Sequence, residues 1–432
     1  MGGTAIGQLL GLLALPLLTR IYSANDFSVL AIYLAVLGIL SSVICMRFDT
    51  AIPLPDDESE AQNLLLLALM SITGITLLLS IIVIFFSETL AQIAGMKDFS
   101  SFLWLVPIGS AFVGLYSAFQ FMALRKKAFV EISKTRLTQA ASGISAQVIL
   151  GFSFSGPIGL LVGYTLMSGI GVISLGLRAL KSALMQAHFP SWLILARTAA
   201  KYKKFPQYSL TEGLINTGGI QIPVLLIGIH YIGPEAGYLF LAMRVLGSPL
   251  GIIGSAVSQV YYSHAAQYER DGQLAEETVK IFKRLSAWLV LPMVTLGPFA
   301  PDIFRLVFGQ EWGQAGTLLV WMLPWYAFQS IASPISTVMY VRNLQGWLLM
   351  LSILGFLIRV VPLSTAIFIA PEYLSKCFAV SSAIYYFILL FSLLIAAKLQ
   401  FKKVIFLVTR SIFVWTVCGI LSFSIINGKI LF

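Results

Sequence analysis

Apolar runs of about 20 residues recur along the whole chain, with only one break between them longer than about 25 residues. A helix that crosses a bilayer needs about 20 mostly apolar residues, so each run is long enough to span a membrane. Only 11% of the 432 residues are charged, against about 25% in an average soluble chain. The pattern predicts an all-α polytopic membrane protein and excludes a soluble catalytic domain held by a single anchor.

Thirteen segments are predicted to span the membrane, and their limits follow the apolar runs. They cover residues 2–19, 27–46, 61–86, 102–124, 135–154, 156–177, 209–231, 236–261, 285–307, 315–341, 346–369, 374–397 and 404–428. Twelve of these spans return the chain to its starting side, and the last is an additional C-terminal span.

The lysines and arginines test this topology, because they collect in cytoplasmic loops. Twenty-one of the 28 lie on one side of the predicted spans, five lie on the other, and Arg244 and Arg359 fall inside spans. The N-terminus is therefore predicted to be cytoplasmic. Since the basic residues lie between spans and not on an aqueous domain, the net charge of +10 does not indicate a nucleic-acid partner.

The longest polar break, residues 178–208, lies at the centre of the chain and separates two similar halves. Phe27–Leu30 followed by Val36–Gly38 corresponds to Ala236–Leu239 followed by Val245–Gly247, at a constant offset of 209. Such duplication is typical of transporters. The sequence predicts two six-helix lobes around a central cavity. They are an N-lobe at 1–181, a cytoplasmic linker at 182–208, a C-lobe at 209–398 and the additional span at 399–432.

The arginines inside spans are the strongest candidates for a functional role, because a charge at the bilayer centre costs at least about 2.5–3.5 kcal/mol. Arg244 is expected roughly 12 Å into span eight, and Arg359 roughly 20 Å along span eleven. All 18 acidic residues fall in loops or at span ends, so no carboxylate is expected at either depth. Both arginines are predicted to bind an anionic ligand, and guanidinium suits phosphate. A buried ion pair or snorkelling to the interface remains the alternative.

Four ionisable residues at span ends are weaker candidates. Arg20 and Arg47 end spans one and two on opposite sides and are predicted to contact substrate, although Arg47 is also explained as a topology signal neutralised by Asp49. Glu212, near the cytoplasmic start of span seven, and Asp49 are the candidates for ion coupling. At a helix start, Glu212 also complements the helix dipole.

No catalytic residue, metal site or cofactor is expected, so the protein is predicted not to be an enzyme. The acidic clusters at 56–60 and 271–277 precede helices in solvated loops, where acids favour the helix start. The three histidines are scattered, no nucleotide-binding Gly-x-x-x-x-Gly-Lys-Ser/Thr motif is present, and the three cysteines read as core packing. The outer connections are too short to hold a catalytic domain, which argues against a membrane glycosyltransferase or polymerase.

Several motifs resemble those of the polysaccharide transporters of the multidrug/oligosaccharidyl-lipid/polysaccharide exporter superfamily, and more narrowly the O-antigen flippases of the Wzx type. The motifs are Gly3–Leu10, Pro16–Ser23, Asp26–Phe27, Arg47–Ile52 with the acids after it, Phe205–Pro206, Ile215–Asn216 through Pro223, Ala236–Tyr238, Arg244 and Pro249. The chain departs from the family pattern at Ser28, where a glycine is usual. It also starts directly at Met1–Gly2–Gly3, without the usual basic stretch, so a longer natural N-terminus is expected.

The resemblance implies translocation of an undecaprenyl-pyrophosphate-linked oligosaccharide, such as an O-antigen unit for lipopolysaccharide, from the cytoplasmic to the outer leaflet by alternating access. It implies a bacterial inner membrane and a cationic cavity between two lobes. Partners would be membrane lipids and, in polysaccharide biosynthesis, a polymerase and a chain-length regulator. A multidrug extruder of the same superfamily is the alternative, but it would be expected to offer buried carboxylates to cationic drugs.

Overall fold

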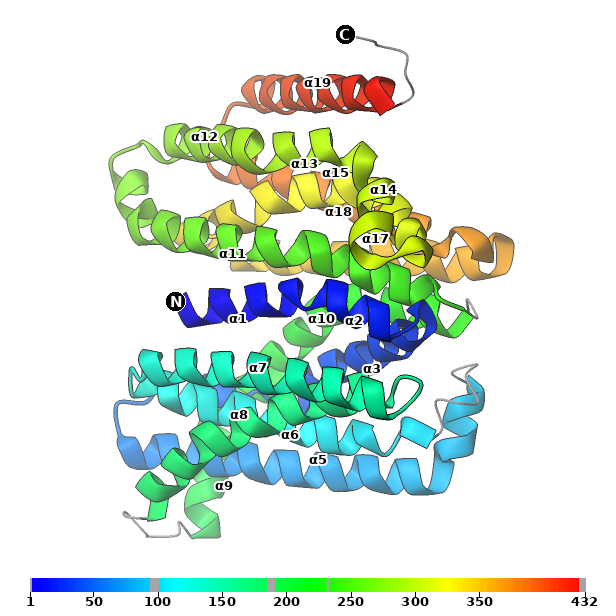
Figure 1. Cartoon of the computed structure of the whole chain (residues 1–432). Coiled ribbons are helices and arrows are strands. Elements are labelled where there is room, and N and C mark those ends of the chain that lie inside the picture. The colour runs from blue at the N-terminus through cyan, green and yellow to red at the C-terminus, as the bar shows by residue number, and fades with distance from the viewer. Residues whose placement is uncertain (1, 94–100, 185–190, 231–232, 427–432) are drawn as a thin grey trace. The chain divides into compact units, whose positions relative to one another are not determined.

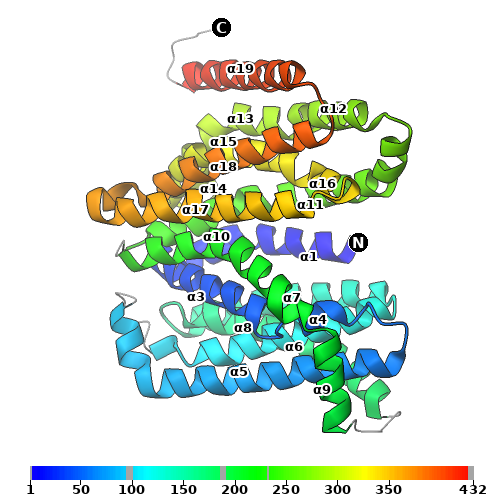
Figure 2. The same ribbon diagram turned by 180° about the vertical axis from the view of Figure 1, so that it is seen from behind.

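The computed structural model describes residues 2–93, 101–184, 191–230 and 233–426, and the regular structure within these ranges is helical (Figures 1 and 2). The helices are α1 (Gly2–Leu13), α2 (Leu15–Ile21), α3 (Ala24–Val43), α4 (Phe48–Ala51), α5 (Glu58–Ile93), α6 (Leu105–Arg125), α7 (Phe129–Ser153), α8 (Ile158–Leu184), α9 (Trp192–Lys201), α10 (Leu210–His230), α11 (Glu235–Arg270), α12 (Leu274–Leu285), α13 (Leu291–Leu296), α14 (Ala300–Phe308), α15 (Gly313–Ile335), α16 (Val338–Val341), α17 (Gln345–Ile369), α18 (Leu374–Ala396) and α19 (Phe401–Ile426). Part of the predicted outer loop 87–101 lies outside the described residues.

The prediction of a polytopic all-α membrane protein is confirmed. Ten helical segments in the described ranges are long and apolar enough to cross a membrane, and four further helices, α1 with α2, α7 and α15, occupy the three remaining predicted spans. Exposed apolar side chains cover whole surfaces of these helices, as on α5, where Leu77, Ile81, Ile84 and Phe85 are all more than half exposed. An exposed apolar surface of this extent requires a lipid environment.

Proline breaks several of the predicted spans into shorter pieces. The span predicted at 285–307 consists of a π-helical turn at Ser286–Val290, then α13, a 3-10 turn at Gly297–Phe299 and α14. Pro292, Pro298 and Pro301 cannot donate the backbone hydrogen bond that an unbroken helix needs. The single apolar run therefore folds as a chain of short helical segments.

The helices form two compact units, Met1–Gly237 and Tyr238–Phe432. The first unit contains α10, which packs along α3, and the second begins within α11. The boundary predicted at residue 209 rests on the repeated sequence motifs, whereas these two units are defined by how the helices pack. The predicted boundary between the lobes therefore stays a prediction. The predicted linker 182–208 contains a helix of its own, α9, which packs against α5 and carries the Lys201–Glu60 ion pair.

Polar contacts inside the first unit fix α10 and the start of α11 against α3. The hydroxyls of Ser42 and Thr217 are 3.0 Å apart. Ser28 donates to the Gly233 carbonyl at 3.0 Å and accepts from the Gly237 backbone N–H at 2.8 Å. Ser28 and Gly237 are separated by 209 residues, the offset of the predicted repeat. The two repeat-equivalent positions are therefore in direct contact.

In the second unit, α11 is the longest helix, with 36 residues. At 1.5 Å per residue it is roughly 54 Å long, against about 30 Å for a bilayer core. Near its end, Glu269 lies 3.7 Å from Arg342, which follows α16, and 2.7 Å from Lys398, which follows α18. One carboxylate therefore joins the ends of three helices.

Candidate functional site

A stripe of polar and small residues runs along α11 and includes Arg244. The stripe consists of Arg244, Ser248, Gly251, Ser255, Gln259 and Tyr262, of which Ser248 is half-buried and the others are exposed. Successive members are three or four residues apart, which places them on one side of a helix. Arg244 and Tyr262 are roughly 27 Å apart along the axis, most of the thickness of a bilayer core. We call this set the α11 stripe.

The other two sides of α11 differ from the stripe in character. Leu239, Leu246 and Tyr261 are buried on the side that packs into the second unit. Ile253 and Val260 are exposed apolar residues on the third side, which suits contact with lipid. Because polar groups in lipid are costly, a helix with this division directs its polar side to water or to a polar ligand.

Arg244 itself lies roughly 14 Å along α11 from Glu235 and is exposed. Within the described residues it makes no ion pair or side-chain hydrogen bond. Its helical turn is held in place by Tyr326 of α15, whose hydroxyl donates a hydrogen bond of 3.3 Å to the Met243 carbonyl. The structure thus presents a guanidinium with no partner in the described part of the chain on a fixed backbone, and its binding of an anion stays a prediction.

Arg359 occupies a different environment from the one expected. It is 4% exposed within the second unit, with its guanidinium 4.2 Å from the centre of the Tyr385 ring and 5.3 Å from that of Tyr386. Both tyrosines belong to α18, and the guanidinium lies over their rings, where the ring quadrupole attracts a cation. A side chain held this way is not open to a ligand in this conformation, so Arg359 does not share the accessible position of Arg244.

An aromatic cluster connects the Arg359 site with the turn that carries Arg244. Tyr386 stacks against Trp325 at 6.5 Å between ring centres, and Trp325 contacts Tyr326 at 5.0 Å. Tyr326 is the residue that bonds the Met243 carbonyl. We infer that Arg359 acts through this cluster as a positioning residue for α11.

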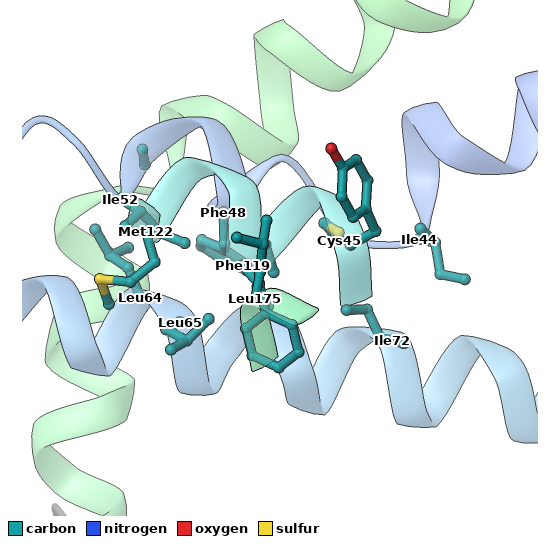
Figure 3. Packing of buried hydrophobic residues seen from close by; sticks show 14 residues of the cluster. Ile44, Cys45, Phe48, Ile52, Leu64, Leu65, Ile72, Phe119, Met122 and Leu175 are labelled. Carbon is teal, nitrogen blue, oxygen red and sulfur yellow. The ribbon is translucent and has the colours of Figure 1, made fainter. Parts of the chain in front are cut away.

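Arg47 stands at a sharp turn between α3 and α4 in the first unit. Met46 and Arg47 both adopt left-handed backbone conformations, with φ of 49° and 59°. Such conformations are unfavourable by roughly 1–2 kcal/mol for each residue with a side chain. The adjoining core compensates for this strain, because Ile44, Cys45, Phe48 and Ile52 are all buried in one apolar cluster with residues of α5, α6 and α8 (Figure 3). The cluster fixes the direction in which Arg47 leaves the backbone.

The Arg47 guanidinium lies directly against Gly213 of α10, so closely that a Cβ at position 213 would overlap it. Its Nε is buried and has no hydrogen-bond partner in the described part of the chain. A half-buried guanidinium with an unused, buried donor is a site at which an anion can bind. No ion pair to Asp49 is formed there, so the neutralisation by Asp49 considered from the sequence is not what holds Arg47.

A Gly213→Ala variant is expected to displace the Arg47 guanidinium while leaving the protein folded. The added methyl overlaps only the end of a flexible side chain, which can rotate away at a cost of roughly 0.5–1.5 kcal/mol. Transport of the natural substrate should fall severalfold, with thermal unfolding in detergent nearly unchanged. Gly346→Ala, where nothing lies within 4 Å of the new Cβ, is the control. Equal activity of both variants would show that the position of Arg47 does not matter.

The other predicted residues are placed as follows. Asp49 is 4% exposed and its Oδ2 accepts a hydrogen bond of 2.6 Å from the Ser117 hydroxyl of α6. Glu212 is exposed in the first turn of α10, next to the glycine that Arg47 contacts. Arg20 is exposed in the last turn of α2. Since α3 separates Arg20 from Arg47, the two arginines stand roughly 30 Å apart along the helix direction.

Arg136, one of the 21 basic residues assigned to the cytoplasmic side, is placed by the structure among packed side chains of a helix. It lies on α7, donates to the Gln120 side chain at 3.0 Å and sits 5.0 Å from the centre of the Tyr116 ring. The α11 stripe was also missed, although its spacing of three and four residues is visible in the sequence. This spacing does not stand out in the sequence, because serine and glycine are common in membrane helices.

Comparison with known proteins places this architecture in a family. The family model described as "Polysaccharide biosynthesis protein" matches residues 17–316. No curated protein matches the chain. Among solved structures, the chain is similar to the lipid II flippase MurJ in an inward closed conformation, with a TM-score of 0.74 and 16% identity over 99% of this chain and 97% of that one. It is also similar to the MATE transporter ClbM in complex with Rb⁺, with a TM-score of 0.43 and 13% identity over 94% and 93%.

At such low identity the likeness to MurJ shows the fold alone. The family match covers well over half of the chain. The chain therefore belongs to the polysaccharide biosynthesis protein family.

Proposed function

We propose that the protein is a flippase, not an enzyme, that moves an undecaprenyl-pyrophosphate-linked oligosaccharide, of the O-antigen or a related surface polysaccharide, from the cytoplasmic to the outer leaflet. The observation that carries the proposal is the α11 stripe with the unpaired Arg244 at its outer part. A polar track of this length accommodates sugar hydroxyls, and a guanidinium at membrane depth suits a pyrophosphate. Membership of a polysaccharide biosynthesis family supports the same substrate class.

The arginines have separate roles in this proposal. Arg244 holds the pyrophosphate within the membrane, and Arg47 and Arg20 contact it nearer the two ends of α3. Arg359 keeps the α11 turn in place and does not touch the substrate. The remaining cations set an orientation with the N-terminus in the cytoplasm of a bacterial inner membrane. A polymerase and a chain-length regulator would act on the product, because a repeat unit delivered to the outer leaflet still needs to be assembled.

The charge of the substrate suggests what drives transport. A pyrophosphate diester carries about two negative charges, and moving each across 100 mV is worth about 2.3 kcal/mol, so an inside-negative potential favours export by about 4.6 kcal/mol. In proteoliposomes with a lipid-linked oligosaccharide, a potassium diffusion potential, negative on the side that the lipid leaves, should speed flipping severalfold. The readout is the fraction of oligosaccharide exposed to an external glycosidase or lectin.

Two controls make this experiment decisive. Liposomes without protein should show no flipping at either potential, and a pH gradient at zero potential should have little effect. Asp49→Asn and Glu212→Gln should retain the response to the potential. If flipping followed the pH gradient and not the potential, and if Asp49→Asn or Glu212→Gln abolished it, proton coupling through that carboxyl would replace this mechanism.

A further inference from the structure

A pocket of about 1100 Å³ lies between α12 and α19 in the second unit. Figures 1 and 2 label these two helices. The pocket is formed by α12, the π-helical turn after it, the turn between α18 and α19, and the first half of α19. We call it the α12–α19 pocket. The α11 stripe contributes no residue to it, so the proposed transport function does not account for it.

The lining of the α12–α19 pocket is strongly basic. Lys283 comes from α12, Lys398 from the turn before α19, and Lys402, Lys403 and Arg410 from α19 or its start. Lys398 is paired with Glu269, whereas no ion pair in the described ranges involves the other four. The lining holds a single acidic residue, Glu276, and that carboxylate is already paired with Lys280 at 2.9 Å. The pocket therefore carries more positive charge than its single lining carboxylate can balance.

Apolar side chains line the same pocket. They include Leu291, Leu407 and Val414, together with Trp415, whose indole N–H donates to the Ser286 hydroxyl at 2.9 Å. On α19, Lys403, Leu407, Arg410 and Val414 follow at intervals of three or four residues, so charged and apolar groups alternate along one helix side. An occupant needs an anionic head beside the lysines and an apolar chain reaching toward Trp415.

We propose that the α12–α19 pocket binds an anionic phospholipid of the surrounding bilayer, with its phosphate among Lys283, Lys402, Lys403 and Arg410 and an acyl chain along α19 toward Trp415. Basic pockets between membrane helices on the cytoplasmic side are suited to anionic lipid headgroups. Lys283, Lys402 and Lys403 lie on the side that the distribution of lysines and arginines assigns to the cytoplasm. Arg410, two turns into α19, reaches back to the headgroup by extending its side chain.

The combination of basic and apolar lining residues distinguishes this lipid from other anions. A free phosphate would contact the lysines but leave the apolar lining residues without a partner. The polyprenyl carrier of the proposed substrate has an anionic head as well, but it would be expected at Arg244 on the α11 stripe. Contact with a bilayer lipid gives a role to α19, the additional C-terminal span.

Native mass spectrometry of the purified full-length chain in detergent tests the proposal. After lipid removal, the protein is titrated with phosphatidylglycerol or with phosphatidylcholine of the same acyl chains. Wild type should retain one phosphatidylglycerol and show at least tenfold weaker retention of phosphatidylcholine. Since each cation near a headgroup contributes roughly fivefold, K402Q/K403Q/R410Q should weaken phosphatidylglycerol retention by about a hundredfold. The matched control K134Q/R197Q/K203Q removes three exposed cations from the first unit and should retain the lipid as wild type does.

Three results would overturn the proposal: equal retention of the two lipids, equal loss in the triple variant and its control, or displacement of the lipid by undecaprenyl pyrophosphate at lower concentration than phosphatidylglycerol itself requires. Inorganic phosphate should not displace it.

If the triple variant unfolds, K402Q/K403Q, at two exposed positions, is measured instead and should show about a twentyfold loss of phosphatidylglycerol retention. Brominated phosphatidylglycerol should quench less fluorescence in W415F than in wild type. Arg244→Ala should retain the lipid, so failure here is distinguishable from failure of the flippase proposal.

Discussion

An Arg244→Ala variant is expected to fold and insert into the membrane but to lose surface polysaccharide. The guanidinium is exposed on α11 and has no partner among the described residues, so its removal leaves no buried group unpaired. What is lost is its charge-assisted hydrogen bonding to the pyrophosphate, worth about 3 kcal/mol, or roughly a hundredfold in affinity. The measurements are surface glycan in cells and flipping in proteoliposomes, with thermal unfolding as the test of folding.

Two further variants test whether the loss of activity is specific to Arg244 and to the bidentate geometry of its guanidinium. Arg244→Lys keeps the charge but loses the bidentate geometry, so it should retain part of the activity. Arg305→Ala removes another exposed arginine, one that pairs with Asp302 at 3.3 Å, and should be active. Normal surface glycan in Arg244→Ala would remove Arg244 from the substrate site.

A Gly237→Ala variant is expected to destabilise the protein by about 3 kcal/mol, near the upper end for overpacking. A Cβ at this position would overlap the Ala24 carbonyl oxygen and stand 3.0 Å from the Ser28 nitrogen. Both are backbone atoms of α3, which cannot rotate away, and the shift would also break the bond between the Gly237 N–H and Ser28. The loss is measured as a lower midpoint of thermal or denaturant unfolding in detergent.

Gly74→Ala is the matched control for Gly237→Ala, because nothing lies within 4 Å of a Cβ at position 74 of α5. Alanine there should be neutral or stabilise the helix by up to about 1 kcal/mol. Ser28→Ala should cost about 1 kcal/mol through the lost hydrogen bonds. If Gly237→Ala unfolded at the same midpoint as Gly74→Ala, the contact between the two repeat-equivalent positions would not be important for stability.

The fold could be predicted because the bilayer leaves few choices. Every backbone group in hydrocarbon needs an internal partner, so apolar runs of sufficient length become helices. This reasoning located α3, α6 and α17 within a few residues of their observed limits. It could not show that the run at 285–307 folds as several pieces, since a proline in a membrane helix is accommodated either by a bend or by a break, depending on its neighbours.

The candidate site was predictable only in part. Depth along a span follows from counting residues, so Arg244 and Arg359 were expected alike within the membrane. Which way each side chain points depends on neighbouring helices, and for Arg359 the deciding residues are Tyr385 and Tyr386 on α18. The contact of Arg47 with Gly213 joins residues that are far apart in the sequence, and no pattern around either residue indicates it.

The length of α11 and the position of Glu269 have a mechanical consequence. A helix of roughly 54 Å is a lever, and a tilt of about 5° around its outer end moves the other end by roughly 5 Å, close to the pitch of one helical turn. Glu269 stands at that moving end and is tied to Arg342 and Lys398. A small rotation imposed near Arg244 is thereby enlarged and delivered to the ends of α16 and α18 together.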